Sequence, residues 1–296
     1  MNIFSILVTS VFAAETILSP LGGMPTPEIE IKKPQVSFGS LSATPAVLSD
    51  EPFIGPIMAA VSPTPTPQPK PIRKTKQQTV TVALLGDSMM DTLGSDAPHL
   101  KNALKKIYPG TTFIIKNFGV GGANIQYGIE RITNGYTYLG TSYTPLITTN
   151  PDIVVIESFG YNPFGDDQSA ITTHWLLLAE TIDTIKAHLP NTQIVMAATI
   201  APNAHKFGDG APGLAFSLED KWKRVETIKK YLENAIRFAN SEHLPLADAY
   251  HASLLSDGNG NLAYINSGDY IHYSDKGRQL MADRITGTIA QKRLLE

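Results

Sequence analysis

Residues 80–88 read VTVALLGDS, and the first strand of the predicted sheet is found here. Its unbroken run of apolar and β-branched residues predicts a strand that is buried on both faces. The turn residues Gly86, Asp87 and Ser88 follow at once. A serine at the end of such a strand can project its hydroxyl over the edge of the sheet, while its own backbone N–H faces the same spot. The tripeptide alone is typical of an ordinary turn. Only its position directly after the first strand makes Ser88 a candidate nucleophile.

Strand and helix patterns alternate along the rest of the chain. Short β-branched runs predict strands at 79–85, 112–116, 152–157, 193–199 and 244–248. Helical periods are predicted at 97–108, 125–132, 169–189, 218–241 and 275–292. Five strands that are each followed by a helix predict an α/β fold, with a parallel sheet between layers of helices.

The helix predicted at 218–241 carries apolar residues at spacings of three and four. This period places them on one face of the helix, and we expect that face to pack in the core. The residues are Leu218, Trp222, Val225, Ile228, Leu232, Ile236 and Ala239.

The N-terminal part of the chain has a different composition. Residues 3–14 are mostly apolar and end in the small-residue pattern of a cleavage site, so 1–15 are interpreted as a signal peptide or a short apolar segment. Twelve of the 21 prolines precede residue 72, and 16–77 are interpreted as a disordered linker rich in Pro, Thr and Ser. The remaining 78–296, roughly 220 residues, suffice for one domain. We expect a secreted or cell-surface protein.

Charge and cysteine content exclude several classes of function. A net charge of −3 gives no footprint for nucleic acid, and the basic run 70–76 is interpreted as a solvated linker end. The chain has no cysteine, which excludes disulfides, thiolate metal sites and a cysteine nucleophile. The apolar segment 3–14 is too short to span a membrane unaided.

A serine hydroxyl needs a base at neutral pH, usually a histidine oriented by a carboxylate. Two histidines lie three residues after an aspartate: His251 after Asp248, and His272 after Asp269. Asp248 ends a predicted strand, where it is expected to cap the following turn. His272 is the favoured base, because Ser274 provides an N-cap for the next helix and so a rigid support for this loop.

Two further strand ends carry groups that can bind an oxyanion. Gly122 follows the second strand, where glycine lets backbone N–H groups approach a ligand, and Asn162 follows the third with a neutral amide donor. Ligands of parallel sheets bind beyond the carboxyl ends of the strands, so both are expected near Ser88. A phosphate-binding loop is the alternative for the glycines, and an Asx turn before Pro163 is the alternative for Asn162.

These blocks, in this order, resemble the SGNH or GDSL hydrolase superfamily over 79–292. Gly86-Asp87-Ser88 is similar to its first block, and Gly122 lies five residues after Asn117, as in the second. In the third block, Gly160-Tyr161-Asn162 matches but Pro163 replaces the usual aspartate. In the last, Asp269 and His272 match, followed by Ser274 and Gly277.

The resemblance implies a flavodoxin-like fold of three layers, α/β/α, with a five-stranded parallel sheet in order 2-1-3-4-5. It also implies a catalytic triad of Ser88, Asp269 and His272, an oxyanion hole formed by Ser88, Gly122 and Asn162, and no metal or organic cofactor. We therefore expect a monomeric serine esterase that acts on an ester-bearing small molecule or an acylated glycan, for example by deacetylating an extracellular polysaccharide. An O-acyltransferase with the same triad and a non-catalytic carbohydrate-binding surface module are the alternatives.

Aromatic residues near these motifs have two interpretations: a wall that stacks on sugars or binds an acyl group, or ordinary core and rim packing. They are Tyr127, Tyr161, Phe164, Trp175, Tyr270 and Tyr273.

Overall fold

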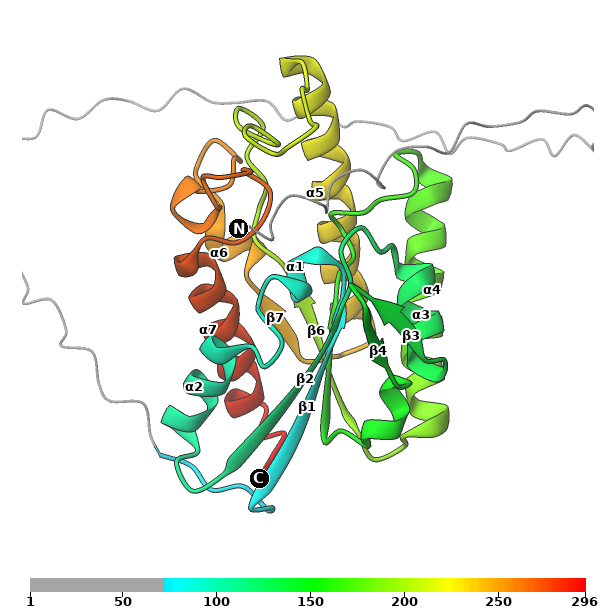
Figure 1. The fold of residues 1–296 in the computed structure, drawn as a ribbon, viewed down its shortest axis with the longest axis vertical. Helices are drawn as coiled ribbons and strands as arrows, with labels where there is room; N and C mark the ends of the chain where they lie inside the picture. Colours follow the sequence, from blue (N-terminus) through cyan, green and yellow to red (C-terminus); the bar gives the residue numbers. More distant parts are fainter. Residues whose placement is uncertain (1–71) are drawn as a thin grey trace, which may run out of the picture. The chain divides into compact units, whose positions relative to one another are not determined.

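A parallel sheet of five strands forms the centre of the folded part (Figure 1). The computed structural model describes residues 72–296. The strands are β1 (Thr79–Gly86), β2 (Thr112–Gly119), β5 (Ile153–Glu157), β6 (Gln193–Ala198) and β7 (Leu246–Asp248). They lie in the order β2-β1-β5-β6-β7, and each neighbouring pair is parallel. Counted along the chain within this sheet, the order is 2-1-3-4-5, so the predicted topology is confirmed.

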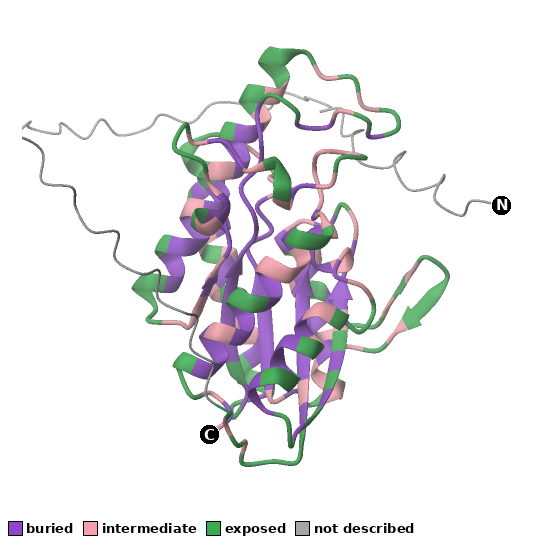
Figure 2. Cartoon of the chain, turned by 90° about the vertical axis from the view of Figure 1, so that its left-hand side faces the viewer, coloured by how far each residue is buried: buried purple, intermediate pink, exposed green. Residues whose placement is uncertain are grey.

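Helices cover both faces of the sheet (Figure 1). They are α1 (Ser88–Asp91), α2 (Pro98–Ile107), α3 (Ile125–Thr133), α4 (Gln168–His188), α5 (Leu218–Ser241), α6 (Tyr250–Ser253) and α7 (Asp275–Gln291), with the 3₁₀ helices η1 (Leu146–Thr149) and η2 (Leu262–Tyr264). Side chains of β1 alternate between the two layers. Val82 and Leu84 pack in the cluster of α2 and α7, whereas Ala83 and Leu85 pack in the cluster of α3, α4 and α5. The strands β1, β5 and β6 are buried on both faces along most of their length, as the purple strands in Figure 2 show, and this explains their continuous apolar sequences. The edge strand β2 is buried on one face, and alternate residues on its other face are exposed.

All five predicted strands and all five predicted helices are present, but a short hairpin was not predicted. It consists of β3 (Tyr136–Tyr138) and β4 (Thr141–Tyr143), which pair antiparallel between α3 and η1. Its turn residues, Leu139 and Gly140, have φ values of 49° and 77°. Two consecutive positive φ values are typical of the type I′ turn, whose usual sequence signal is Asn-Gly. Leu-Gly does not give that signal.

The apolar face of α5 is buried only in part. Val225, Ile228 and Leu232 are at most 2% exposed, as predicted. Leu218 and Trp222, in contrast, are 59% and 38% exposed, so their assignment to the core is wrong. The physical reason is the length of α5: its first turns extend past the end of the sheet, so the sheet does not cover them (Figure 1).

A carboxyl group is buried where β5 ends. Glu157 is fully buried; its side chain accepts hydrogen bonds from Asp87 N (3.3 Å) and from Ser158 Oγ (2.6 Å). The contact with β1 is close, since a Cβ on Gly86 would lie 2.7 Å from the Glu157 Cβ. Burial raises the pKa of Glu157 well above 4.5, and the neighbouring Asp87 charge raises it further. Glu157 therefore holds a proton at pH values where an exposed glutamate is ionised.

The first described residues already contact the domain. Arg73 N donates to Ile107 O (2.8 Å), Lys76 N donates to Leu295 O (2.9 Å), and the Arg73 guanidinium pairs with Glu296 (2.6 Å). The predicted N-terminal segment 1–15 and most of the predicted linker 16–77 lie outside the described residues. Within 72–296, no helix is long and apolar enough to cross a membrane.

Leu232→Ala tests the division of α5 into a packed and a projecting part. We expect this change to lower the free energy of unfolding by about 2–5 kcal/mol, because it leaves a cavity in the core. Leu218→Ala, on the exposed part of the same helix, is the matched control and should change it by less than about 0.5 kcal/mol. Urea denaturation measures both, and equal losses would contradict the burial described for α5.

Glu157→Gln tests the protonation of the buried carboxyl group. Because the folded-state pKa of Glu157 lies above its ordinary value of 4.5, its stabilising contribution is complete below pH 4.5 and is lost as the pH rises toward that raised pKa. Glutamine is neutral throughout. The stability of the wild type relative to the variant should therefore fall as the pH rises above 4.5, by at most about 1.4 kcal/mol per pH unit. The free energies of unfolding of both proteins are measured by urea denaturation at several pH values. A difference between them that does not change with pH would show that the pKa of Glu157 is not raised in the folded state.

Candidate active site

The turn after β1 places Ser88 at the start of a helix. Asp87 is the N-cap of α1, with φ −93° and ψ −151°, and its carboxylate accepts the Met89 N–H at 2.7 Å. Ser88 is the first residue of α1 and is partly exposed. An N–H in the first turn of a helix has no intrahelical acceptor, so the Ser88 N–H is available to a ligand.

Asn162 reaches the same turn from the end of β5. Its Nδ2 donates to Asp87 Oδ2 at 2.8 Å, so the two predicted strand-end motifs are in contact. Its side chain makes this bond across to Asp87 and not the Asx turn that was the alternative. An amide nitrogen carries two N–H groups, so one remains for a ligand. Burial raises the pKa of Asp87, while the hydrogen bonds from Met89 N–H and Asn162 act in the opposite direction.

Gly122 lies in the loop after β2 and is exposed. Its φ of 73° is in the left-handed region that favours glycine. The end of β2 and the loop that follows it are both held by hydrogen bonds. Asn117, near the end of β2, donates through Nδ2 to Met90 O (2.7 Å) and Gly94 O (2.9 Å), and Gly121 N donates to the Tyr138 hydroxyl at 3.0 Å.

Arg131 joins the ends of two strands beneath the site. It is 1% exposed; Nη1 donates to Phe118 O at 2.6 Å and Nη2 to Gly86 O at 3.0 Å. Burial lowers its pKa, but the guanidinium lies over the rings of Tyr127 (5.0 Å) and Tyr136 (5.6 Å), which favour the charged form.

Sequence reasoning gave no role to the side chains of Glu157, Arg131 or Tyr138. A signal exists for the first two, because Glu157 ends an otherwise apolar strand and Arg131 lies on the buried face of α3. Nothing in the sequence points to Tyr138, which reaches the site from the unpredicted hairpin.

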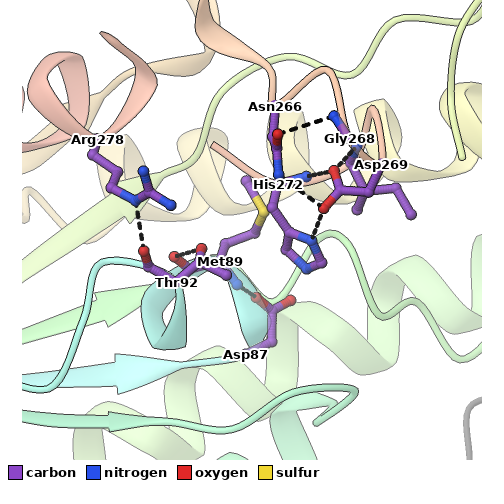
Figure 3. A network of polar contacts seen from close by, with 9 residues as sticks. Asp87, Met89, Thr92, Asn266, Gly268, Asp269, His272 and Arg278 are labelled. Atoms are coloured by element: carbon purple, nitrogen blue, oxygen red, sulfur yellow. Dashed lines mark hydrogen bonds and ion pairs between the residues drawn. The ribbon is translucent and has the colours of Figure 1, made fainter. Parts of the chain in front are cut away.

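Asp269 and His272 form a hydrogen-bonded pair in the loop before α7 (Figure 3). Asp269 Oδ2 accepts from His272 Nδ1 at 2.9 Å, and its Oδ1 accepts the backbone N–H groups of Ile271 (2.8 Å) and His272 (3.0 Å). Tyr270 allows this tight turn with a φ of 51°. Burial raises the pKa of Asp269, but the hydrogen bonds from His272 and Ile271 N–H outweigh it and hold the pKa below 3.8. The loop ends at Ser274, which caps α7 by accepting Gly277 N–H at 3.1 Å.

The His272 ring faces the start of α1. In Figure 3 it lies between Asp269 and the turn at Asp87. Burial raises the pKa values of Asp87 and Asp91, and a positive charge on His272 acts in the opposite direction on both. These two residues flank Ser88. Within 72–296, no hydrogen bond joins the Ser88 hydroxyl to His272. Catalytic hydrogen bonds are often long until a substrate binds.

His251, the other histidine of an Asp-x-x-His pair, has the same local geometry in a different place. Its Nδ1 lies 2.7 Å from Asp248 Oδ2, and its backbone N–H donates to Asp248 Oδ1 at 2.9 Å. Its Nε2, however, lies 3.5 Å from Glu233 on α5, and half of its side chain is exposed. It has no hydrogen-bond or ion-pair contact with α1 among the described residues.

The aromatic residues near the motifs have different surroundings. Tyr273 is fully buried, and Trp175 packs edge-on against Phe238, so these two belong to the core. Tyr161 and Tyr270 are partly exposed at the same end of the sheet as Ser88. Within 72–296, no group of His, Asp or Glu residues is arranged to hold a metal ion.

Solved structures with this fold include GDSL-like lipases. One from Bacteroides thetaiotaomicron VPI-5482 is 14% identical with a TM-score of 0.51, and the match covers 72% of this chain and 88% of that one. A putative GDSL-like lipase from Parabacteroides merdae ATCC 43184 is 20% identical with a TM-score of 0.53, covering 76% and 99%. An acetyl xylan esterase is 16% identical with a TM-score of 0.50, covering 71% and 100%.

Comparison with family models gives the identification. No match was found among curated proteins. Residues 84–280 match the model of the GDSL-like Lipase/Acylhydrolase family, and this range includes all five predicted site residues. The match spans more than half of the 296 residues. The chain belongs to the GDSL-like lipase/acylhydrolase family and is a serine hydrolase.

Proposed function

We propose that this protein hydrolyses carboxylic esters with Ser88 as nucleophile, His272 as base and Asp269 as the group that orients the base. One observation carries the proposal: the hydrogen-bonded pair of Asp269 and His272 faces the helix start where Ser88 lies (Figure 3). The bond between His272 Nδ1 and Asp269 leaves Nε2 as the ring nitrogen that can accept a proton.

The reaction has two steps. In the first, His272 Nε2 takes the Ser88 proton as Oγ attacks the ester carbonyl, and it then gives this proton to the leaving alcohol. In the second, His272 takes a proton from water as the water oxygen attacks the acyl-enzyme, and it then returns this proton to Ser88 Oγ as the bond between the acyl carbon and Oγ breaks and the acid leaves. Asp269 stays ionised and stabilises the imidazolium, a role that fits its lowered pKa.

Three N–H groups are proposed to bind the oxyanion: those of Ser88 and Gly122 in the backbone and the second N–H of Asn162 Nδ2. Their common feature is that each is fixed by a neighbouring group. Asp87 caps the helix start and orients Asn162, and Gly121 is held directly before Gly122. Donors that are fixed before the reaction need no reorganisation when the charge develops.

We propose a short acyl ester on a glycan as the substrate. Tyr161 and Tyr270, which are partly exposed at the same end of the sheet as Ser88, are the aromatic residues proposed to contact the sugar. The structural relative named an acetyl xylan esterase agrees with this class of substrate. A secreted or cell-surface location is proposed for the same reason, because acylated polysaccharides are exposed there.

Replacement of each histidine in an Asp-x-x-His pair tests the choice of base. With p-nitrophenyl acetate as substrate, we expect His272→Ala to lower the rate as strongly as Ser88→Ala, because nucleophile and base act as one unit. His251→Ala removes a histidine with the same local geometry and should keep the wild-type rate. Unchanged hydrolysis in Ser88→Ala would end the esterase proposal, and loss of activity only in His251→Ala would change the base.

Asn162→Ala tests the third oxyanion donor. We expect kcat to fall by about 100- to 1000-fold, the range found when one such donor is removed. Because Asn162 also donates to Asp87, the urea midpoint should be measured beside the rate to separate catalysis from folding. Full activity in the folded variant would remove Asn162 from the oxyanion hole.

A further inference from the structure

The hydroxyl of Tyr138 connects two loops of the candidate active site. It accepts the Gly121 N–H at 3.0 Å and donates to Asp91 Oδ2 at 2.9 Å. Tyr138 lies at the end of β3, in the hairpin that sequence analysis did not predict. The two bonded groups belong to segments far from each other in sequence, so one phenol group links α1 to the loop after β2.

Both segments carry proposed oxyanion donors. Asp91 ends the four-residue helix that begins at Ser88, and Gly121 directly precedes Gly122. We infer that Tyr138 is a positioning residue: it fixes the Ser88 N–H and the Gly122 N–H relative to each other, so that both can bind one oxyanion. The inference rests on the proposed esterase function.

The protonation states suit this bridge. Burial raises the pKa of Tyr138 to about 12, and the hydrogen bond to Asp91 raises it as well, while that from Gly121 N–H lowers it. The phenol therefore keeps its proton at neutral pH and donates it to the Asp91 carboxylate. Its oxygen remains free to accept the Gly121 N–H.

The hairpin is itself anchored, through Arg131, to the ends of β1 and β2. The rings of Tyr136 and Tyr143 stack with centroids 4.8 Å apart and an interplanar angle of 4°. The Arg131 guanidinium lies 5.6 Å from the centroid of the Tyr136 ring, and the same side chain donates to Gly86 O and Phe118 O. The position of Tyr138 is thus tied to the strands β1 and β2 that precede the two loops.

The expected effect is a loss of transition-state binding. Without the bridge, the amide of Gly122 can move relative to Ser88, and a displacement of about 1 Å near a reacting group can cost about 100-fold in rate. Tyr138 is not assigned a contact with the substrate itself. We therefore expect kcat to fall by about 10- to 100-fold in Tyr138→Phe, with KM within about twofold of the wild type.

Tyr138→Phe and Tyr143→Phe in the full-length protein form a matched pair. Each removes one hydroxyl from the same hairpin and keeps the ring, but only Tyr138 bridges the two loops. The measurements are kcat and KM for p-nitrophenyl acetate, the inhibition constant of a boronic acid that mimics the tetrahedral intermediate, and the urea midpoint. Tyr138→Phe should weaken the boronic acid by a factor similar to the loss in kcat, and Tyr143→Phe should change neither.

A second pair tests the bridge from its other end. Asp91→Asn keeps an oxygen that accepts from the Tyr138 hydroxyl, whereas Asp91→Ala does not. We expect kcat to be at least about tenfold higher in the asparagine variant than in the alanine variant. About tenfold is the lower limit of the loss expected when the bridge is removed. This pair also decides the question if Tyr138→Phe fails to fold.

The outcomes that overturn the inference are distinct from failure of the proposed function. Wild-type kcat and boronic acid affinity in a folded Tyr138→Phe, or equal effects of the two tyrosine changes, would reject the bridge while esterase activity remains. Equal kcat values in the two Asp91 variants would reject it as well. If the wild type shows no hydrolysis that depends on Ser88, the proposed function fails and the inference fails with it.

Discussion

The hydrogen bonds of the buried residue Asp87 hold the candidate site together. Its carboxylate accepts the Met89 N–H, which caps α1, and also accepts from Asn162 Nδ2. Its backbone N–H donates to Glu157. One residue thereby ties the end of β1 to the end of β5 and to the segment after it. A charged group without water is costly unless hydrogen bonds satisfy it, so the same bonds that stabilise Asp87 also fix the direction of the Ser88 turn.

Most of the architecture could be predicted from the sequence because the inner strands β1, β5 and β6 are buried on both faces. Such strands appear as short continuous apolar runs, and the helices between them show a clear period. Because Ser88, Gly122 and Asn162 each follow the carboxyl end of a predicted strand, they could be predicted to lie at the same end of the sheet. The pairing of Asp269 with His272 and the helix cap at Ser274 could also be predicted, because both depend on residues that lie close together in the sequence.

The parts that could not be predicted depend on tertiary contacts. Leu218 and Trp222 fit the period of α5, but the period does not reveal where the sheet ends. The hairpin lacks the usual turn residues, and its role arises from hydrogen bonds between Tyr138 and residues 17 and 47 positions away. Glu157 and Arg131 are buried ionisable residues with hydrogen-bond partners, such as Asp87 N and Gly86 O, that lie far away in the sequence. No pattern within a short window of sequence reports such pairs.

The two Asp-x-x-His pairs have a consequence for the recognition of catalytic sites by shape. In both, the carboxylate accepts the histidine Nδ1 and the histidine N–H, with distances that differ by at most 0.2 Å. A three-dimensional template built from aspartate and histidine alone would return both pairs as hits. What separates them is the group opposite Nε2: a glutamate for His251, and the helix start that bears a serine for His272. A useful template for this fold must therefore include the end of the first strand.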